Sequence, residues 1–160
     1  MEKQNIISII GKIRRYANDQ IIRSLMERGL KGISPSHGGI LVILFQEEIV
    51  PMKVIAQRID RKKNTVTVLV EKLVKLGFVQ KKSSVTDNRV NLVSLTPKGR
   101  SLIPDFEEIS KELIKKVYTG FADYEKEDLS RLLAKVLLNF QKTPSDIGSR
   151  TDLNLNKNSL

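Results

Sequence analysis

The hydrophobic period of this chain changes at Gly77, and that change limits the folds open to it. From Lys63 to Leu76 apolar residues recur every three or four positions, which is the period of an amphipathic helix. After Gly77 apolar and polar residues alternate over 78–82 and again over 90–95, which is the period of a strand. A polar loop joins these two segments. The sequence therefore predicts a helix followed directly by a β-hairpin.

Helices are predicted before this unit. Residues 3–28 carry one apolar stripe, and Ser34-Pro35, a cap residue followed by proline, starts a central helix that is apolar on most sides. Pro51 opens a short helix that ends in a turn at Asp60-Arg61. The stripe of the first helix consists of Ile6, Ile10, Ile13, Ala17, Ile21 and Leu25.

Two more helices are predicted after the hairpin. Thr96-Pro97 starts the first by the same rule of cap and proline, and its stripe continues to Phe121. The second runs from about Glu125, and the polar residues 142–160 are expected to form a flexible tail. The inward positions are Leu102, Phe106, Ile109, Leu113, Val117 and Phe121, then Leu129, Leu132, Leu133, Val136, Leu137 and Phe140. The fold class is thus mainly α with a small β-hairpin.

Composition excludes several kinds of protein. With 160 residues, 40% of them hydrophobic, the chain is the size of one domain with a core. It has no cysteine and one histidine, His37, which excludes a disulfide framework, a cysteine nucleophile and a histidine-rich metal site. No run reaches the ~18 apolar residues of a membrane span, and no signal-peptide layout opens the chain. A cytoplasmic protein without a membrane partner is expected.

The positive charge lies almost entirely in the middle third. The formal net charge is +10, and residues 51–100 hold twelve lysines and arginines against three acidic residues. A solvated basic surface would account for a scattered excess. An excess confined to one subdomain is typical of a protein that binds a polyanion.

Two short helices over about 51–77, the second basic at its start and followed by a basic hairpin, form a winged helix-turn-helix pattern. A helix fits the major groove of DNA and meets base edges with its N-terminal residues. Lys62 and Lys63 can neutralise phosphates, and Asn64 offers both a donor and an acceptor to a base edge. The hydroxyl groups of Thr65 and Thr67 can bond to phosphate or base.

The hairpin adds Lys81, Lys82 and Arg89 to this surface. A guanidinium group at the tip of a wing suits a narrow minor groove. Lysines on a helix usually form only a solvated face, but here they coincide with a helix-turn-helix period and a basic hairpin, which favours DNA.

The run from Met52 to Gly99 resembles the DNA-binding lobe of MarR-type transcriptional regulators. The resemblance, with its flanking helices, covers about residues 3–141. The pieces that carry it are Ile55-Ala56, Asn64-Thr65-Val66-Thr67, Leu69-Val70-Glu71-Lys72-Leu73, Gly77-Phe78-Val79, Asp87-Asn88-Arg89 and Leu95-Thr96-Pro97-Lys98-Gly99.

The resemblance implies a winged-helix domain over 1–141. Its DNA-binding lobe would occupy 34–99 with the wing at 78–95, and residues 3–30 and 100–141 would form a helical dimerisation base. Asn64, Thr65 and Thr67 would lie near the major groove. Arg89 would enter the minor groove, held by Asp87.

Three positions depart from the family. The turn carries Asp60-Arg61 where glycine and an apolar residue are frequent, although aspartate tolerates a left-handed backbone better than most residues. The wing has Asn88 between Asp87 and Arg89, where arginine is common. Val68 stands where many members carry arginine.

Dimerisation also follows from the stripes on 3–28, 100–121 and 125–140, which are more apolar than a lobe of about fifty residues can cover. A twofold dimer would place two recognition helices about 34 Å apart on a near-palindromic site. The alternative is a monomer with these helices folded back.

No catalytic residues, cofactor or metal site is predicted. The acidic pairs have no second catalytic group beside them, and the glycines form no phosphate loop. His37 either lines a pocket for a small-molecule effector, as the resemblance allows, or bonds locally in the first turn of its helix, which we favour.

We therefore expect a dimeric, sequence-specific transcriptional regulator, a repressor that a small molecule relieves. Two alternatives remain: a winged helix that docks an acidic protein partner, and a non-specific DNA-binding protein. Asn64, Thr65 and Thr67 favour DNA reading, because an acidic partner needs only the charges.

Overall fold

The computed structural model describes residues 5–83 and 91–141, and it divides into two compact units, 1–116 and 117–160. The first unit holds the helices α1 (Ile6–Glu27), α2 (Pro35–Gln46), α3 (Met52–Arg58), α4 (Lys63–Lys75) and α5 (Pro97–Arg100), and nearly all of α6 (Ile103–Val117). The second holds α7 (Asp123–Gln141). These elements agree with the predicted mainly α-helical class.

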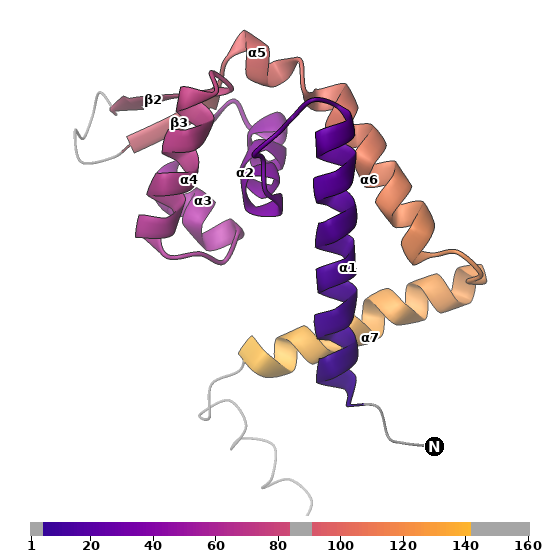
Figure 1. Cartoon of the computed structure of the whole chain (residues 1–160). Coiled ribbons are helices and arrows are strands. Elements are labelled where there is room, and N and C mark those ends of the chain that lie inside the picture. Colours follow the sequence, from indigo (N-terminus) through magenta and orange to yellow (C-terminus); the bar gives the residue numbers. More distant parts are fainter. Residues whose placement is uncertain (1–4, 84–90, 142–160) are drawn as a thin grey trace, which may run out of the picture. The chain divides into compact units, whose positions relative to one another are not determined.

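Helix α2 lies at the centre of the first unit, between α1 and the α3–α4 pair (Figure 1). Ser34 caps it and Pro35 occupies its first turn, as the sequence predicted. The core is formed by apolar side chains of α2, α3, α4 and the sheet that are almost fully buried. They include Ile40, Leu41, Leu44, Ile55, Val66, Val70, Leu73, Val79 and Val93, with Leu25 from α1.

The sheet is antiparallel with the order β1-β3-β2. Strands β2 (Val79–Ser83) and β3 (Asn91–Leu95) form the predicted hairpin, with Lys81 opposite Val93. Strand β1 (Ile49–Pro51) was not predicted. Three residues ending in proline show no alternation, and β1 exists only through its pairing with β3.

The expected single helix after Thr96 is interrupted. Helix α5 ends at Arg100, and α6 begins at Ile103. Pro104 explains the break, because proline lacks the N–H that would donate to the carbonyl of Arg100 and its ring would clash with that carbonyl.

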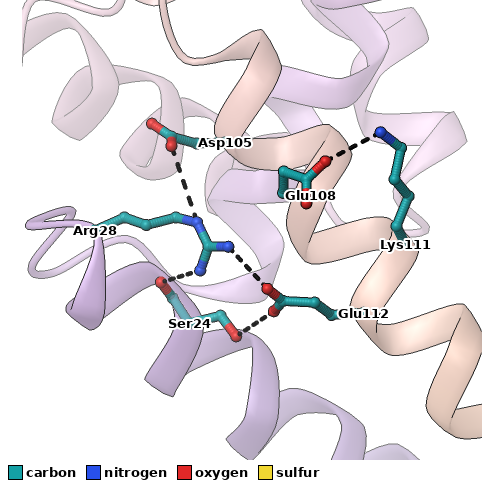
Figure 2. A network of polar contacts seen from close by, with 6 residues as sticks. All are labelled: Ser24, Arg28, Asp105, Glu108, Lys111 and Glu112. Atoms are coloured by element: carbon teal, nitrogen blue, oxygen red, sulfur yellow. Dashed lines mark hydrogen bonds and ion pairs between the residues drawn. The ribbon is translucent and has the colours of Figure 1, made fainter.

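A polar network joins the end of α1 to α6 (Figure 2). The guanidinium group of Arg28 donates to Glu112 at 3.0 Å and to the backbone carbonyl of Ser24 at 3.1 Å. The hydroxyl of Ser24 donates to the same carboxylate at 3.3 Å, and Asp105 lies 3.9 Å from the guanidinium.

The outer helices bury few of their predicted inward residues within one chain. In α1 only Leu25 of the predicted stripe is buried, and Ile6 and Ile13 are more than half exposed. In α6 Phe106 and Ile109 are buried, whereas no residue of α7 is. The expectation of inward positions is thus wrong for α7 in the single chain, because none of the described residues of its own unit, 117–141, buries that stripe.

Candidate nucleic-acid interface

The turn between α3 and α4 is closed by backbone hydrogen bonds. The amide of Asp60 donates to the carbonyl of Gln57 at 3.3 Å, and that of Arg61 donates to the carbonyl of Ala56 at 3.0 Å. Asp60 adopts a φ of +51°, the left-handed conformation that glycine usually supplies after a helix. Aspartate at this position therefore preserves a tight helix-turn-helix.

The start of α4 is exposed and has no side-chain cap. Lys62 is the capping residue, and no side chain bonds to the free N–H groups of the first turn. Lys62, Lys63, Asn64 and Thr65 are all exposed, as expected for residues that contact a ligand. The positive end of a helix dipole beside two ammonium groups attracts phosphate.

Thr67 differs from its neighbours. Its hydroxyl donates to the backbone carbonyl of Lys63 at 3.0 Å and lies 3.5 Å from the sulfur of Met52 in α3. The side chain is half-buried. Its contacts therefore hold α4 against α3 and turn the hydroxyl inward.

A cleft of about 520 Å³ lies beside the turn. Its charged lining consists of four cations and one carboxylate: Lys53, Arg61, Lys62, Lys63 and Asp60. Lys53 and Arg61 were counted in the basic third but not assigned to the site. Lys53 lies at the start of α3 and Arg61 in the turn before α4, and these positions in the sequence could have assigned both to the site.

An ion pair ties strand β2 of the hairpin to α4. The ammonium group of Lys81 in β2 lies 3.8 Å from the carboxylate of Glu71 in α4. Lys82, the next residue, is exposed. Asp87 and Arg89, the other predicted wing residues, lie outside the described residues.

The end of α4 is fixed as well. Gly77 has a φ of +77°, and the amide of Phe78 donates to the carbonyl of Leu73 at 3.0 Å, which confirms the predicted glycine stop. The hydroxyl of Thr96 donates to the carbonyl of Gly77 at 2.6 Å. Both ends of α4 are thus fixed by hydrogen bonds in the adjoining turns, and its C-terminal end also by the more distant Thr96.

His37 is buried and bonded within its own first turn. Its Nδ1 accepts from the backbone amide of Ser34 at 3.1 Å, and the hydroxyl of Ser34 lies 2.7 Å from the same nitrogen. Burial, and secondarily the charge of Lys72, lower the pKa of His37 below its ordinary value of 6.5. This geometry agrees with the local structural role.

A second cleft, of about 580 Å³, lies where α1, α2 and the end of α3 meet. Its lining includes Arg14, Arg58 and Arg61, together with apolar residues such as Val42 and Ile43. One of these cations is already partnered, because the Arg58 guanidinium pairs with Glu47. His37 is not among its lining residues.

Two features that residues 5–83 and 91–141 lack bear on other functions. No group of three or more histidine, cysteine, aspartate or glutamate side chains is arranged to hold a metal ion. Within the same ranges no helix is both long and apolar enough to cross a membrane.

A tight helix-turn-helix whose second helix begins with exposed basic residues, followed by a hairpin, defines a winged helix-turn-helix protein. Residues 33–90 match the sequence model of the MarR family. The HTH-type transcriptional regulator MhqR of Bacillus subtilis is 25% identical over 131 residues, 82% of this chain and 88% of the relative. These comparisons support a MarR-type winged-helix transcriptional regulator, and the relatives they name are regulators rather than enzymes.

Solved structures share the fold. A MarR transcriptional regulator from Methanosarcina mazei matches with a TM-score of 0.76 and 24% identity, over 85% of this chain and 96% of that one. The structure of the S. aureus MepR–DNA complex matches with a TM-score of 0.79 and 20% identity, over 86% and 99% of the two chains.

Proposed function

We propose that this regulator is a homodimeric repressor that binds a near-palindromic DNA site and releases it when a small molecule binds. The observation that carries the proposal is the exposed, uncapped start of α4 beside a cationic cleft. Phosphate oxygens would accept hydrogen bonds from the free N–H groups of the first turn. The short polar side chains of Asn64 and Thr65 beside them would contact base edges. The MepR–DNA structure, of similar fold, supports DNA as the partner.

The proposed contacts divide by chemistry. Lys62 and Lys63 bind phosphate, and Asn64 and Thr65 read bases in the major groove. Thr67 holds the helix in place. In the wing, we propose that Lys82 binds phosphate and that Arg89, oriented by Asp87, enters the minor groove.

A twofold dimer is supported by apolar side chains that one chain leaves exposed. In α7 these are Tyr124, Leu132, Leu133, Leu137, Leu138 and Phe140, each at least 44% exposed. A second copy would cover them and would place two α4 helices about one DNA turn apart. Sedimentation of the full chain should show a dimer at micromolar concentration, and a monomer there would contradict the proposal.

The cleft lined by Arg14, Arg58 and Arg61 is the best-supported site for the effector. Arginines beside apolar side chains suit an organic anion with an apolar body. Because His37 is buried and bonded to Ser34, we place it outside this site. Isothermal titration with a panel of aromatic carboxylates tests the assignment, with Arg14→Ala as the variant expected to lose binding.

The central experiment is selection from sheared genomic DNA at about 150 mM salt, where phosphate attraction alone is weakened. Recovery of a few fragments that share a near-palindrome is the expected result. Unselective retention would favour non-specific binding, and no retention would favour a docked acidic protein.

A variant sharpens this test. Asn64→Ala should lower affinity for the recovered sites while leaving binding to random DNA unchanged, because a base contact is lost and no charge is removed. Lys31→Ala is the control, since Lys31 is exposed and lies outside the proposed interface. Equal loss on both DNAs in the Asn64 variant would contradict a base-reading role.

A further inference from the structure

One apolar side chain stands out on the exposed face of α4. Val68 is 67% exposed, whereas Val66 and Val70 on the inner face of the same helix are fully buried. Among the apolar residues of α4 it is the most exposed. The inner side chains fix the rotation of α4, so Val68 is held outward.

The neighbours of Val68 on this face are polar. Residues three and four positions apart share a helix face, which places Asn64 and Thr65 before Val68 and Glu71 after it. Asn64 and Thr65 are exposed. Glu71 is ion-paired with Lys81 of the hairpin at 3.8 Å, so its carboxylate is partly neutralised by the wing.

A single valine among such groups does not make a protein-docking face, which needs a contiguous apolar area. The surrounding cations and free helix N–H groups favour a polyanion instead. The major groove of DNA displays one apolar group, the C5-methyl of thymine, and small apolar side chains contact it there.

We propose that Val68 is a specificity-determining residue that contacts the C5-methyl of a thymine in each half-site. Asn64, one helical turn earlier, would bond to an adjacent adenine through N6 and N7. The recognised class of DNA is then a half-site with neighbouring A·T pairs under the first two turns of α4. The inference rests on the proposed function and adds the base that this face selects.

The test removes the methyl group from the DNA. Each thymine of a recovered site is replaced in turn by deoxyuridine, and affinity is measured for the wild-type dimer and for Val68→Ala. One methyl-sized contact corresponds to about fourfold in affinity per half-site, or about fifteenfold when both half-sites are changed. At that position Val68→Ala should bind thymine and deoxyuridine sites equally.

Controls separate this contact from other causes. Thymines elsewhere in the site should tolerate deoxyuridine, and Val68→Thr, which keeps one methyl and the β-branched shape, should retain part of the preference. Val68 is largely exposed, so both variants should melt within a few degrees of the wild type.

Three results would overturn the inference. If no deoxyuridine substitution weakens the wild type, or if Val68→Ala keeps the full preference, the contact is absent while the proposed function stands. If the chain selects no DNA site at all, both fail together.

Discussion

The ammonium group of Lys98 lies 2.8 Å from the backbone carbonyl oxygen of Leu76, the residue that caps the end of α4. The same group lies 4.9 Å from the centre of the Phe78 ring. A cation at this position satisfies a carbonyl that helix geometry leaves free and complements the negative end of the helix dipole. Lys98, at the head of α5, therefore anchors the helix proposed to read DNA.

Replacing Lys98 tests whether it acts by positioning α4 or by contacting phosphate directly. Lys98→Met should cost about 1 kcal/mol of unfolding free energy, because one charge-assisted bond at an exposed site is lost. Affinity for the selected site should fall while the salt dependence of binding stays unchanged, since Lys98 would touch no phosphate. Urea unfolding and DNA titrations at several salt concentrations measure both. Lys98→Arg should restore part of the loss, and a reduced salt slope would instead make Lys98 a phosphate contact.

Gly99 is required by the close approach of the backbone at Phe78. A Cβ atom at position 99 would lie 2.0 Å from the carbonyl oxygen of Phe78, a clash that no side-chain movement relieves. Gly99→Ala should destabilise the fold by about 2–3 kcal/mol, measured by urea unfolding. Gly11→Ala is the matched control, because open space surrounds that position in α1 and alanine should stabilise the helix by about 0.5–1 kcal/mol. Equal effects at both glycines would show that the clash relaxes.

The ion pair between Arg28 and Glu112 joins α1 to α6 (Figure 2). Both side chains are partly exposed, so a double-mutant cycle with Arg28→Met and Glu112→Gln should give a coupling energy of no more than about 1 kcal/mol. This coupling should weaken at high salt. A coupling energy of zero at low salt would mean that the ion pair contributes nothing to stability.

Lys63 is expected to act as a phosphate contact. Lys63→Ala should lower affinity for selected and random DNA alike and reduce the salt slope by about one. Fluorescence anisotropy at several salt concentrations measures this slope. A changed sequence preference with an unchanged slope would refute the role.

The lowered pKa of His37 predicts that the free energy of unfolding depends on pH. Its folded pKa lies below the ordinary value of 6.5, so the unfolded chain takes up the proton first as the pH falls. The stabilisation is therefore complete above about pH 6.5 and is lost as the pH falls from there through the folded pKa. Protonation of Nδ1 would also remove the acceptor for the Ser34 amide. Thermal melts between pH 5 and 7.5, the range in which a histidine side chain titrates, measure how steeply stability changes with pH.

The matched variant is His37→Gln, whose side-chain oxygen can accept the same amide bond as in an ordinary capping box. It should reduce the slope over that pH range while keeping most of the stability at pH 7.5. An unchanged slope in this variant would assign the effect to other groups.

The local patterns of the sequence determined the elements and much of the candidate site. Periodicity located α2, α4 and the hairpin, the Ser34-Pro35 and Thr96-Pro97 pairs marked helix starts, and Gly77 ended α4. The exposed basic start of α4 was also predicted. These features depend on residues close together in the chain, whose conformational preferences act without the rest of the fold.

Only the tertiary structure decided the contacts between distant segments. Strand β1 forms because β3 lies beside it. Lys98, which follows the hairpin in the chain, bonds to the carbonyl of Leu76, which precedes it. Position 99 requires glycine because of the carbonyl of Phe78, twenty-one positions earlier. The inward turn of Thr67 and the ion pair between Glu71 and Lys81 likewise depend on how α3, α4 and β2 pack. Burial and hydrogen-bond partners are properties of this packing, so no local pattern encodes them.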